Sequence, residues 1–153
     1  MDQSKSIFPF EEPEENAGFL LWQVTMRWQR RIKQGLDPLG LTHTQFVLMA
    51  ALQWLLSARE DVYQVDVANY AQVDKMMTSK VFKTLIGKQL VRMRTSAEDK
   101  RAKQVMLTPK GREVLKQALS VVGRIDTEFF SSLEEQKSEF RQMMQLLMED
   151  KMA

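Results

Sequence analysis

Two short runs of alternating residues interrupt a sequence whose other patterns are helical. In residues 91–95 two arginines alternate with valine, methionine and threonine, and residues 104–108, QVMLT, alternate again. A period of two is the spacing of a β-strand. Eight mostly polar residues, 96–103, join the two runs. The pattern predicts an antiparallel hairpin with a long charged tip inside a domain that is otherwise mainly α-helical.

The segment before the hairpin, residues 66–88, predicts two helices joined by a tight turn. The first helix is short, and the second runs from about residue 74 to residue 88. On the second helix a spacing of four predicts that Met77, Val81 and Leu85 face inward. The opposite face is then polar and basic, with Lys75, Met76, Ser79, Lys80 and Lys83. A short helix, a turn and a helix with one basic face form a helix-turn-helix pattern.

Local signals bound the helices at the N-terminal end of the chain. Residues 16–34 carry a wide apolar face typical of one long helix, which is expected to break at the glycines and proline of residues 35–40. Thr42 and Gln45 have the spacing of a capping box. The helix that they open is apolar on nearly every side, and it is therefore expected to be central and buried.

Two further helices are expected after the hairpin. Thr108 offers an N-cap hydroxyl, and Pro109 occupies the favoured first helical position. The helix that follows carries an apolar stripe over residues 114–129 that is longer than one small domain can cover. Ser131 or Ser132 is expected to cap the last helix.

Charge is distributed very unevenly along the chain. The net charge is only +2, yet residues 74–112 hold eleven lysines and arginines against three acidic residues. Such clustering indicates a surface that binds a polyanion, although a solvated lysine-rich face would have the same composition. Arg92, Arg94, Lys100 and Lys103 serve either phosphate contact or solubility, and both interpretations stay open.

A helix-turn-helix followed directly by a hairpin is a winged helix, and its physics suits duplex DNA. The major groove admits one helix, so Thr78 and Ser79 are expected to reach base edges or phosphates. Arg101 at the hairpin tip is expected to enter the adjacent minor groove, with Asp99 accepting a hydrogen bond from its guanidinium. The candidate DNA-binding residues are Lys75, Met76, Thr78, Ser79, Lys80, Lys83, Arg94, Asp99, Lys100, Arg101 and Lys103.

The order of these elements resembles the MarR family of bacterial transcription regulators, from about Phe19 to the last helix. Asp99-Lys100-Arg101 matches the family's Asp-x-Arg, and Leu107-Thr108 with Gly111 matches its Leu-Thr-x-x-Gly. The segment GLTHTQFVLMAAL, residues 40–52, is similar to the family's second helix. Where the family often has glycine on either side of the recognition helix, this chain has Gln72 and Gln89. Both sites usually favour a left-handed backbone, which costs a residue other than glycine about 1 kcal/mol.

The resemblance implies a single domain over residues 16–153, with a loose acidic arm at 1–15. Residues 42–108 would form the winged helix-turn-helix lobe, and residues 16–34 and 109–150 a helical dimerisation layer. The family pattern implies a homodimer that represses at a pseudo-palindromic operator and is released by a small, aromatic or amphipathic ligand. By analogy, a ligand crevice is expected near Trp22, Met26, Phe46 and Met49. The alternative function is a winged-helix module that binds protein without binding DNA.

Composition argues against other classes of function. The chain has no cysteine and one histidine, His43, so neither a zinc site nor thiol chemistry is expected. His43 is expected at the surface or beside a helix cap. No glycine-rich phosphate loop or His-Glu-x-x-His motif occurs, so neither an enzyme nor a cofactor is expected. No run approaches the length of a membrane span, and the N-terminus lacks a secretory pattern, so a cytoplasmic, nucleoid-associated protein is expected.

Overall fold

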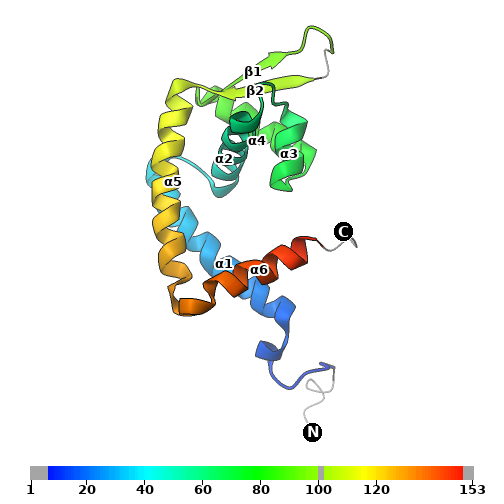
Figure 1. Ribbon diagram of the computed structural model, residues 1–153, viewed down its shortest axis with the longest axis vertical. Coiled ribbons are helices and arrows are strands. Elements are labelled where there is room, and N and C mark those ends of the chain that lie inside the picture. Colours follow the sequence, from blue (N-terminus) through cyan, green and yellow to red (C-terminus); the bar gives the residue numbers. More distant parts are fainter. Residues whose placement is uncertain (1–6, 100–101, 150–153) are drawn as a thin grey trace.

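The computed structural model describes residues 7–99 and 102–149 (Figure 1). Six α-helices and one two-stranded hairpin dominate these residues, with three short 3-10 segments between them. The α-helices are α1 (Ala17–Leu36), α2 (His43–Ala58), α3 (Gln64–Ala71), α4 (Lys75–Gly87), α5 (Pro109–Phe129) and α6 (Lys137–Met148). The strands are β1 (Val91–Thr95) and β2 (Lys103–Leu107), and the 3-10 segments are η1 (Pro13–Glu15), η2 (Asp37–Leu39) and η3 (Ser131–Gln136). The predicted fold class, mainly helical with a small β-hairpin, is confirmed.

Helix α2 lies at the centre of a compact lobe. It contacts α1, α3, α4, α5 and β2, and Leu48, Met49 and Leu52 on it are fully buried. Its N-terminus has the predicted capping box, because Thr42 Oγ1 accepts from Gln45 N at 3.1 Å and Gln45 Oε1 accepts from Thr42 N at 3.1 Å. One residue departs from the expected burial: Trp54, near the end of α2, is 65% exposed.

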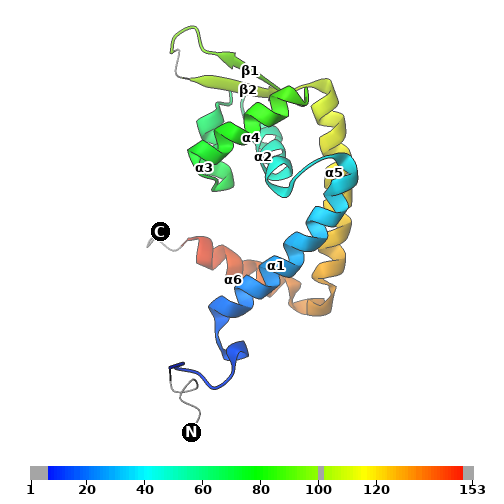
Figure 2. The ribbon, with the colours of Figure 1, turned by 180° about the vertical axis from the view of Figure 1, so that it is seen from behind.

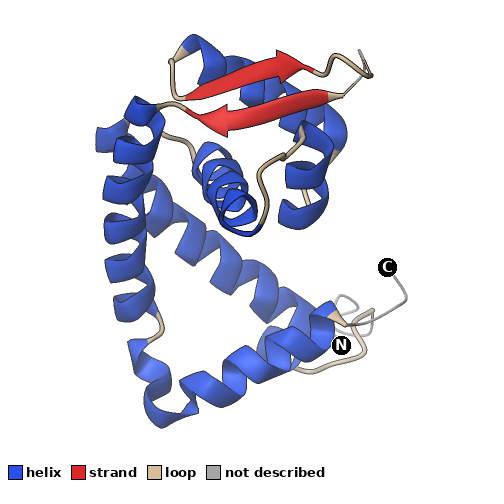
Figure 3. Ribbon diagram, turned by 45° about the horizontal axis from the view of Figure 1, so that its top comes forward, coloured by secondary structure: helices blue, strands red, loops and turns tan. Residues whose placement is uncertain are grey.

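The antiparallel hairpin is present as predicted, with its second strand one residue earlier than the predicted run. Val91 pairs with Leu107 and Thr95 with Lys103 in an antiparallel ladder. The linker between α2 and α3 adds a partial third strand, since Val105 N donates to Val62 O at 2.9 Å. Val91, Val105 and Leu107 are buried on the inner face, so the hairpin closes one side of the lobe (Figure 3).

The turns on either side of α4 are left-handed. Gln72 follows α3 with φ 58°, and Gln89 follows α4 with φ 63°. The structure therefore keeps the left-handed geometry expected at these sites and tolerates the strain of two residues that have a Cβ atom. Each turn is closed by backbone hydrogen bonds: Val73 N donates to Ala68 O, and Leu90 N donates to Leu85 O, both at 3.0 Å.

Two glycines mark close helix contacts. Helix α1 ends within the predicted segment 35–40, but it continues to Leu36, so Gly35 lies inside the helix and does not break it. A Cβ atom at Gly35 would come within 2.5 Å of Ile125 Cδ1, so the missing side chain lets α1 approach α5 closely. Gly111 in the first turn of α5 abuts the Leu90 carbonyl, which a Cβ atom would overlap. Both glycines are thus explained by packing rather than by chain breaking.

Helices α1, α5 and α6 extend away from the lobe, and their axes outline a triangle in the view of Figure 3. Helix α5 begins as predicted, with Thr108 Oγ1 accepting from Gly111 N at 2.9 Å. Figure 2 shows α1 crossing α5, and the two helices are in contact. The predicted serine cap of the last helix is wrong: α6 begins at Lys137 without a side-chain cap, and Ser131 Oγ instead donates to Glu128 O at 2.6 Å.

The outer ends of these helices are poorly covered. None of the twelve residues of α6, all of them described, is buried, and α1 buries only Ile32 and Leu36 near its C-terminus. Among the described residues no single helix is long and apolar enough to cross a membrane. The segments Ala17–Leu39 and His43–Ala58 reach that length and composition together, but the chain bends by 80° between them.

Candidate nucleic-acid interface

Helix α4 presents a different face to the core from the one that its sequence predicts. Met77 was expected to face inward but is 46% exposed, whereas Thr78 was expected on the outer face and is fully buried. Thr78 Oγ1 donates to Asp74 O at 2.9 Å, so its hydroxyl is satisfied inside the helix. The inward stripe is Thr78, Phe82 and Leu85. Leu85 is buried as predicted, whereas Thr78 and Phe82 take the places that were expected for Met77 and Val81. Thr78 is therefore not available to DNA.

The outward face of α4 carries an exposed apolar side chain followed by two lysines. Met76, Lys80 and Lys83 are all exposed, and their i, i+4, i+7 spacing places them on one face, opposite the buried stripe. Met76 is 81% exposed. Asp74 fixes the start of this helix, because its Oδ1 accepts from Met77 N at 2.9 Å. The predicted outer residues other than Thr78 thus lie where the sequence placed them, with Ser79 half-buried.

The wing and the helix-turn-helix enclose a shared basic hollow. A cavity of about 410 Å³ lies between the start of α3, the start of α4 and the distal end of β2. Lys75 from α4 and Lys103 from β2 both line it, together with Thr78. The structure therefore brings together two of the predicted DNA-binding lysines from segments that are far apart in the sequence.

A chain of hydrogen bonds holds one arginine near the tip end of the two strands. Arg94 Nη2 donates to Gln104 Oε1 at 2.8 Å, and Arg94 Nε donates to the same oxygen at 3.3 Å. Gln104 Nε2 in turn donates to Asp61 Oδ1 at 2.6 Å. Gln104 is only 8% exposed, while Arg94 is exposed. Because Gln104 is a neutral acceptor, it orients the guanidinium without cancelling its charge.

Sequence reasoning missed Gln104 and Asp61. The alternating pattern places Gln104 on a strand, but nothing local indicates that the α2–α3 linker passes beside it.

Of the three residues predicted at the tip of the hairpin, the structure describes only one. Asp99 is described and exposed, whereas Lys100 and Arg101 lie outside the described residues, so the minor-groove contact of Arg101 stays a prediction.

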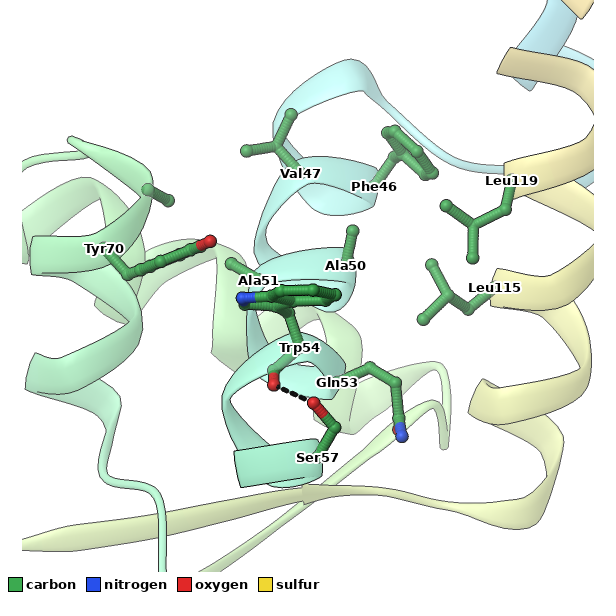
Figure 4. Close-up of a pocket in the computed structure, with 11 residues that line it drawn as sticks. Phe46, Val47, Ala50, Ala51, Gln53, Trp54, Ser57, Tyr70, Leu115 and Leu119 are labelled. Atoms are coloured by element: carbon green, nitrogen blue, oxygen red, sulfur yellow. Dashed lines mark hydrogen bonds between the residues drawn. The ribbon is translucent and has the colours of Figure 1, made fainter. Parts of the chain in front are cut away.

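The four residues predicted to border a ligand crevice do not converge. Met49 is fully buried in the core, and Trp22 and Met26 lie on α1, with Trp22 62% exposed. Only Phe46 lines the apolar cavity of about 550 Å³ that opens between α2, α3 and α5 (Figure 4). The missed sequence signal was Trp54, a large aromatic residue near the end of an otherwise apolar helix.

Aromatic and aliphatic side chains from three helices surround this cavity. Figure 4 shows Trp54 of α2 between Tyr70 of α3 and the pair Leu115 and Leu119 of α5. Trp54, Tyr70 and Leu119 are 65%, 54% and 50% exposed. Gln53 and Ser57 supply polar groups at one end, and no charged residue lines the cavity among the residues that the structure describes. The cavity therefore suits a planar, largely apolar ligand.

His43 lies at the junction of the lobe and the long helices. It is the first residue of α2, beside the cap Thr42 as predicted, and its ring meets Trp28 edge-on at 5.0 Å. Trp28 Nε1 donates to Asp126 Oδ1 at 2.8 Å, which links α1 to α5. Burial lowers the pKa of His43, and the nearby charge of Asp126 partly opposes that shift. Across the described part of the chain, no group of three or more acidic or histidine side chains is placed to hold a metal.

Comparisons with known proteins agree with this geometry. Residues 37–124 match the family described as "ArnR1-like, winged-helix domain". The uncharacterized HTH-type transcriptional regulator YdcH of Bacillus subtilis (strain 168) is 37% identical over 123 residues, which cover 80% of this chain and 84% of that protein.

Solved structures of regulators share the fold. The BpsR protein of Bordetella bronchiseptica, whose DNA binding is regulated by 6-hydroxynicotinic acid, superposes with a TM-score of 0.82 at 22% identity, covering 94% of this chain and 99% of that one. A mutant MarR from E. coli complexed with operator DNA gives a TM-score of 0.78 at 20% identity, covering 98% of this chain and 100% of that one. The chain belongs to the ArnR1-like winged-helix family and has the MarR fold, that of a winged helix-turn-helix transcription regulator.

Proposed function

We propose that the protein is a homodimeric, sequence-specific regulator of promoter DNA, acting as a repressor that a small apolar ligand releases. The observation that carries this proposal is the outward face of α4. Its two lysines stand free of the core on a helix that is capped and packed by its opposite face. Lys75 at the start of the same helix lines a hollow with Lys103 of the hairpin, and Arg94 pairs with Gln104, the next residue of the same strand.

The chemistry of each segment indicates which part of the DNA it would contact. Helix α4 would enter the major groove with its N-terminal turn toward the bases, as recognition helices do. Lys75, Lys80, Lys83 and Lys103 would neutralise phosphates and displace their counterions. Beyond the described residues, Arg101 would reach the narrow minor groove, where the negative potential is strongest.

Dimerisation is supported by the apolar surface that one protomer leaves uncovered. On α6, Leu146 and Leu147 are 66% and 71% exposed, and on α1 Leu21 and Trp22 are 64% and 62% exposed. Monomers rarely expose contiguous apolar patches of this kind. A second copy, pairing its own α1 and α6 with these, would cover them and would set the spacing of two recognition helices against a palindromic site.

Release by a ligand is supported by the cavity at Trp54. The cavity lies between α3 of the helix-turn-helix and the long helix α5, so a bound ligand would contact both helices at once. A ligand that prefers a dimer with the wrong spacing of recognition helices would lower DNA affinity by linkage. BpsR, which shares the fold, has its DNA binding regulated by a small heteroaromatic acid.

The test is binding to DNA under controlled salt. The wild-type protein is used to select duplexes from a random library, and affinity for the enriched duplex is measured between 50 and 200 mM KCl. An affinity loss of roughly 10³- to 10⁵-fold over that range is expected if 6–10 phosphates are contacted. Preference over random DNA should exceed about 10³-fold.

A matched pair of variants makes this test specific. Lys80→Ala removes one lysine from the outward face of α4 and should reduce the salt slope by about one. Lys33→Ala removes an exposed lysine of α1 that pairs with Asp37 and should leave the slope unchanged. Failure to enrich any sequence, or a protein that captures a protein partner through the same face without binding DNA, contradicts the proposal.

A further inference from the structure

The apolar side chain on the DNA-facing side of α4 is unusual in its surroundings. Met76 is the most exposed large hydrophobic residue among those that the structure describes, at 81%. It lies in the first turn of α4, in line with Lys80 and Lys83 and opposite the buried Leu85. The core packing therefore fixes the direction in which Met76 points, and that direction is outward, beside two cations.

The major groove offers only one kind of apolar group to such a side chain. Adenine, guanine and cytosine present hydrogen-bond donors and acceptors there, whereas thymine adds its C5-methyl group. A thioether has no hydrogen to donate and accepts only weakly, so it gains little from the other base edges. It is flexible and packs well against an irregular apolar surface. The residues of the first turn of a recognition helix are those that reach the bases.

We propose that Met76 is a specificity-determining residue that reads thymine methyl groups, so that the operator carries an A·T pair at the position facing the start of α4. This inference rests on the proposed DNA-binding function. The neighbouring Met77 lies about 100° around the helix from Met76, is 46% exposed and provides a matched control. Both methionines are outside the core, so replacing either leaves the fold intact.

The experiment removes single methyl groups from the DNA instead of altering the protein alone. The duplex enriched with the wild-type protein is resynthesised with each thymine replaced in turn by uracil, which lacks only the C5-methyl group. One thymine in each half-site should be sensitive, with an affinity loss of about fourfold per methyl group, the scale of one buried methyl or methylene. Substitution in both half-sites should multiply the two losses.

Variants then assign the sensitivity to one side chain. Met76→Ala should bind the thymine duplex more weakly and should no longer distinguish uracil from thymine at the sensitive position. Met76→Leu, which keeps an apolar side chain, should retain the discrimination, and Met77→Ala should retain it in full. Thermal unfolding of each variant should match the wild type.

The outcomes separate the two proposals. If no sequence is enriched, the proposed function itself fails. If a sequence is enriched but uracil is tolerated at every position, DNA binding stands and the role of Met76 is overturned. The role is also overturned if sensitivity to uracil persists in Met76→Ala or disappears in Met77→Ala.

Discussion

The winged lobe and the outer ends of the long helices use apolar residues in opposite ways. In the lobe, Phe82, Leu48 and Val105 are at most 1% exposed, and one protomer closes that core alone. At the outer ends, residues of the same character, such as Leu146 and Leu147 on α6, remain mostly exposed. The first set of apolar residues is buried by folding of one copy, whereas the second set would be buried only in the proposed dimer. Stability of the lobe should therefore not depend on protein concentration, whereas order in the outer ends should.

The largest expected effect is in the lobe. Phe82→Ala should lower the free energy of unfolding by about 3–5 kcal/mol, because it leaves a cavity beneath α4. Chemical denaturation at fixed protein concentration measures this change. A loss below about 1 kcal/mol would show that the lobe is not the closed core described here. Lys83→Ala, on the exposed side of the same helix, serves as the control and should change stability by less than about 0.5 kcal/mol.

A substitution at the outer ends should weaken dimerisation rather than the stability of the lobe. Leu147→Ala on α6 should raise the dimer dissociation constant at least about tenfold, since burying a leucine is worth about 1.5–3 kcal/mol. Sedimentation velocity over a concentration series measures this constant. If the variant and the wild type dissociate at the same concentration, α6 does not form the interface.

Helix α5 belongs to both regions, and its glycines provide an internal comparison. Gly111→Ala places a Cβ atom against the Leu90 carbonyl and should cost about 1–3 kcal/mol by overpacking. Gly123→Ala meets nothing within 4 Å in the protomer, so it should be neutral or stabilise by up to about 1 kcal/mol through helix propensity. Thermal unfolding of both variants measures these changes in stability. Equal changes in the two variants would contradict the close packing at Leu90.

The hydrogen bonds of Arg94 and Gln104, near the tip end of the hairpin, allow a comparison within the lobe. Gln104→Leu should weaken DNA binding by several-fold, on the scale of one hydrogen bond of about 1 kcal/mol, because Arg94 loses its acceptor. Adding Gln104→Leu to Arg94→Ala should then have no further effect. A double-mutant cycle measured by fluorescence anisotropy tests this. Additive losses would mean that Gln104 acts independently of Arg94.

The smallest expected effect is a dependence on pH at the junction of the two regions. The pKa of His43 is lowered in the folded state, so the unfolded chain takes up the proton first as the pH falls. The stability contributed by neutral His43 is therefore complete above its unfolded pKa of about 6.5. It should decline as the pH falls through the folded pKa. Denaturation of the wild type and His43→Gln between pH 5 and pH 8 should show this dependence only in the wild type.

Sequence patterns predicted the features that short-range geometry determines. The caps at Thr42 and Thr108 and the antiparallel hairpin depend on neighbours in the sequence or on a period of two, and all are confirmed. The family resemblance pointed to left-handed sites at Gln72 and Gln89 but did not decide whether glutamine would keep that geometry, and both residues do. Local chemistry thus accounts for the secondary structure of the lobe.

The features that were missed depend on long-range contacts. Whether Met77 or Thr78 faces the core depends on how α4 packs under the hairpin, and a threonine satisfied within its own helix looks polar in the sequence. The role of Gln104 depends on Asp61, which is 43 residues away. The cavity at Trp54 is formed by three helices, so no single stretch of the sequence predicts it.

Helix α5 also connects the cavity at Trp54 to the outer ends of the molecule. Its 21 residues span about 31 Å at 1.5 Å per residue. Leu115 and Leu119, near one end, form a wall of the cavity at Trp54, and the other end leads into η3 and α6. Over that length a tilt of about 5° displaces the far end by about 2.7 Å. In the proposed dimer, a ligand in this cavity that tilts α5 by that amount would change the distance between the two recognition helices.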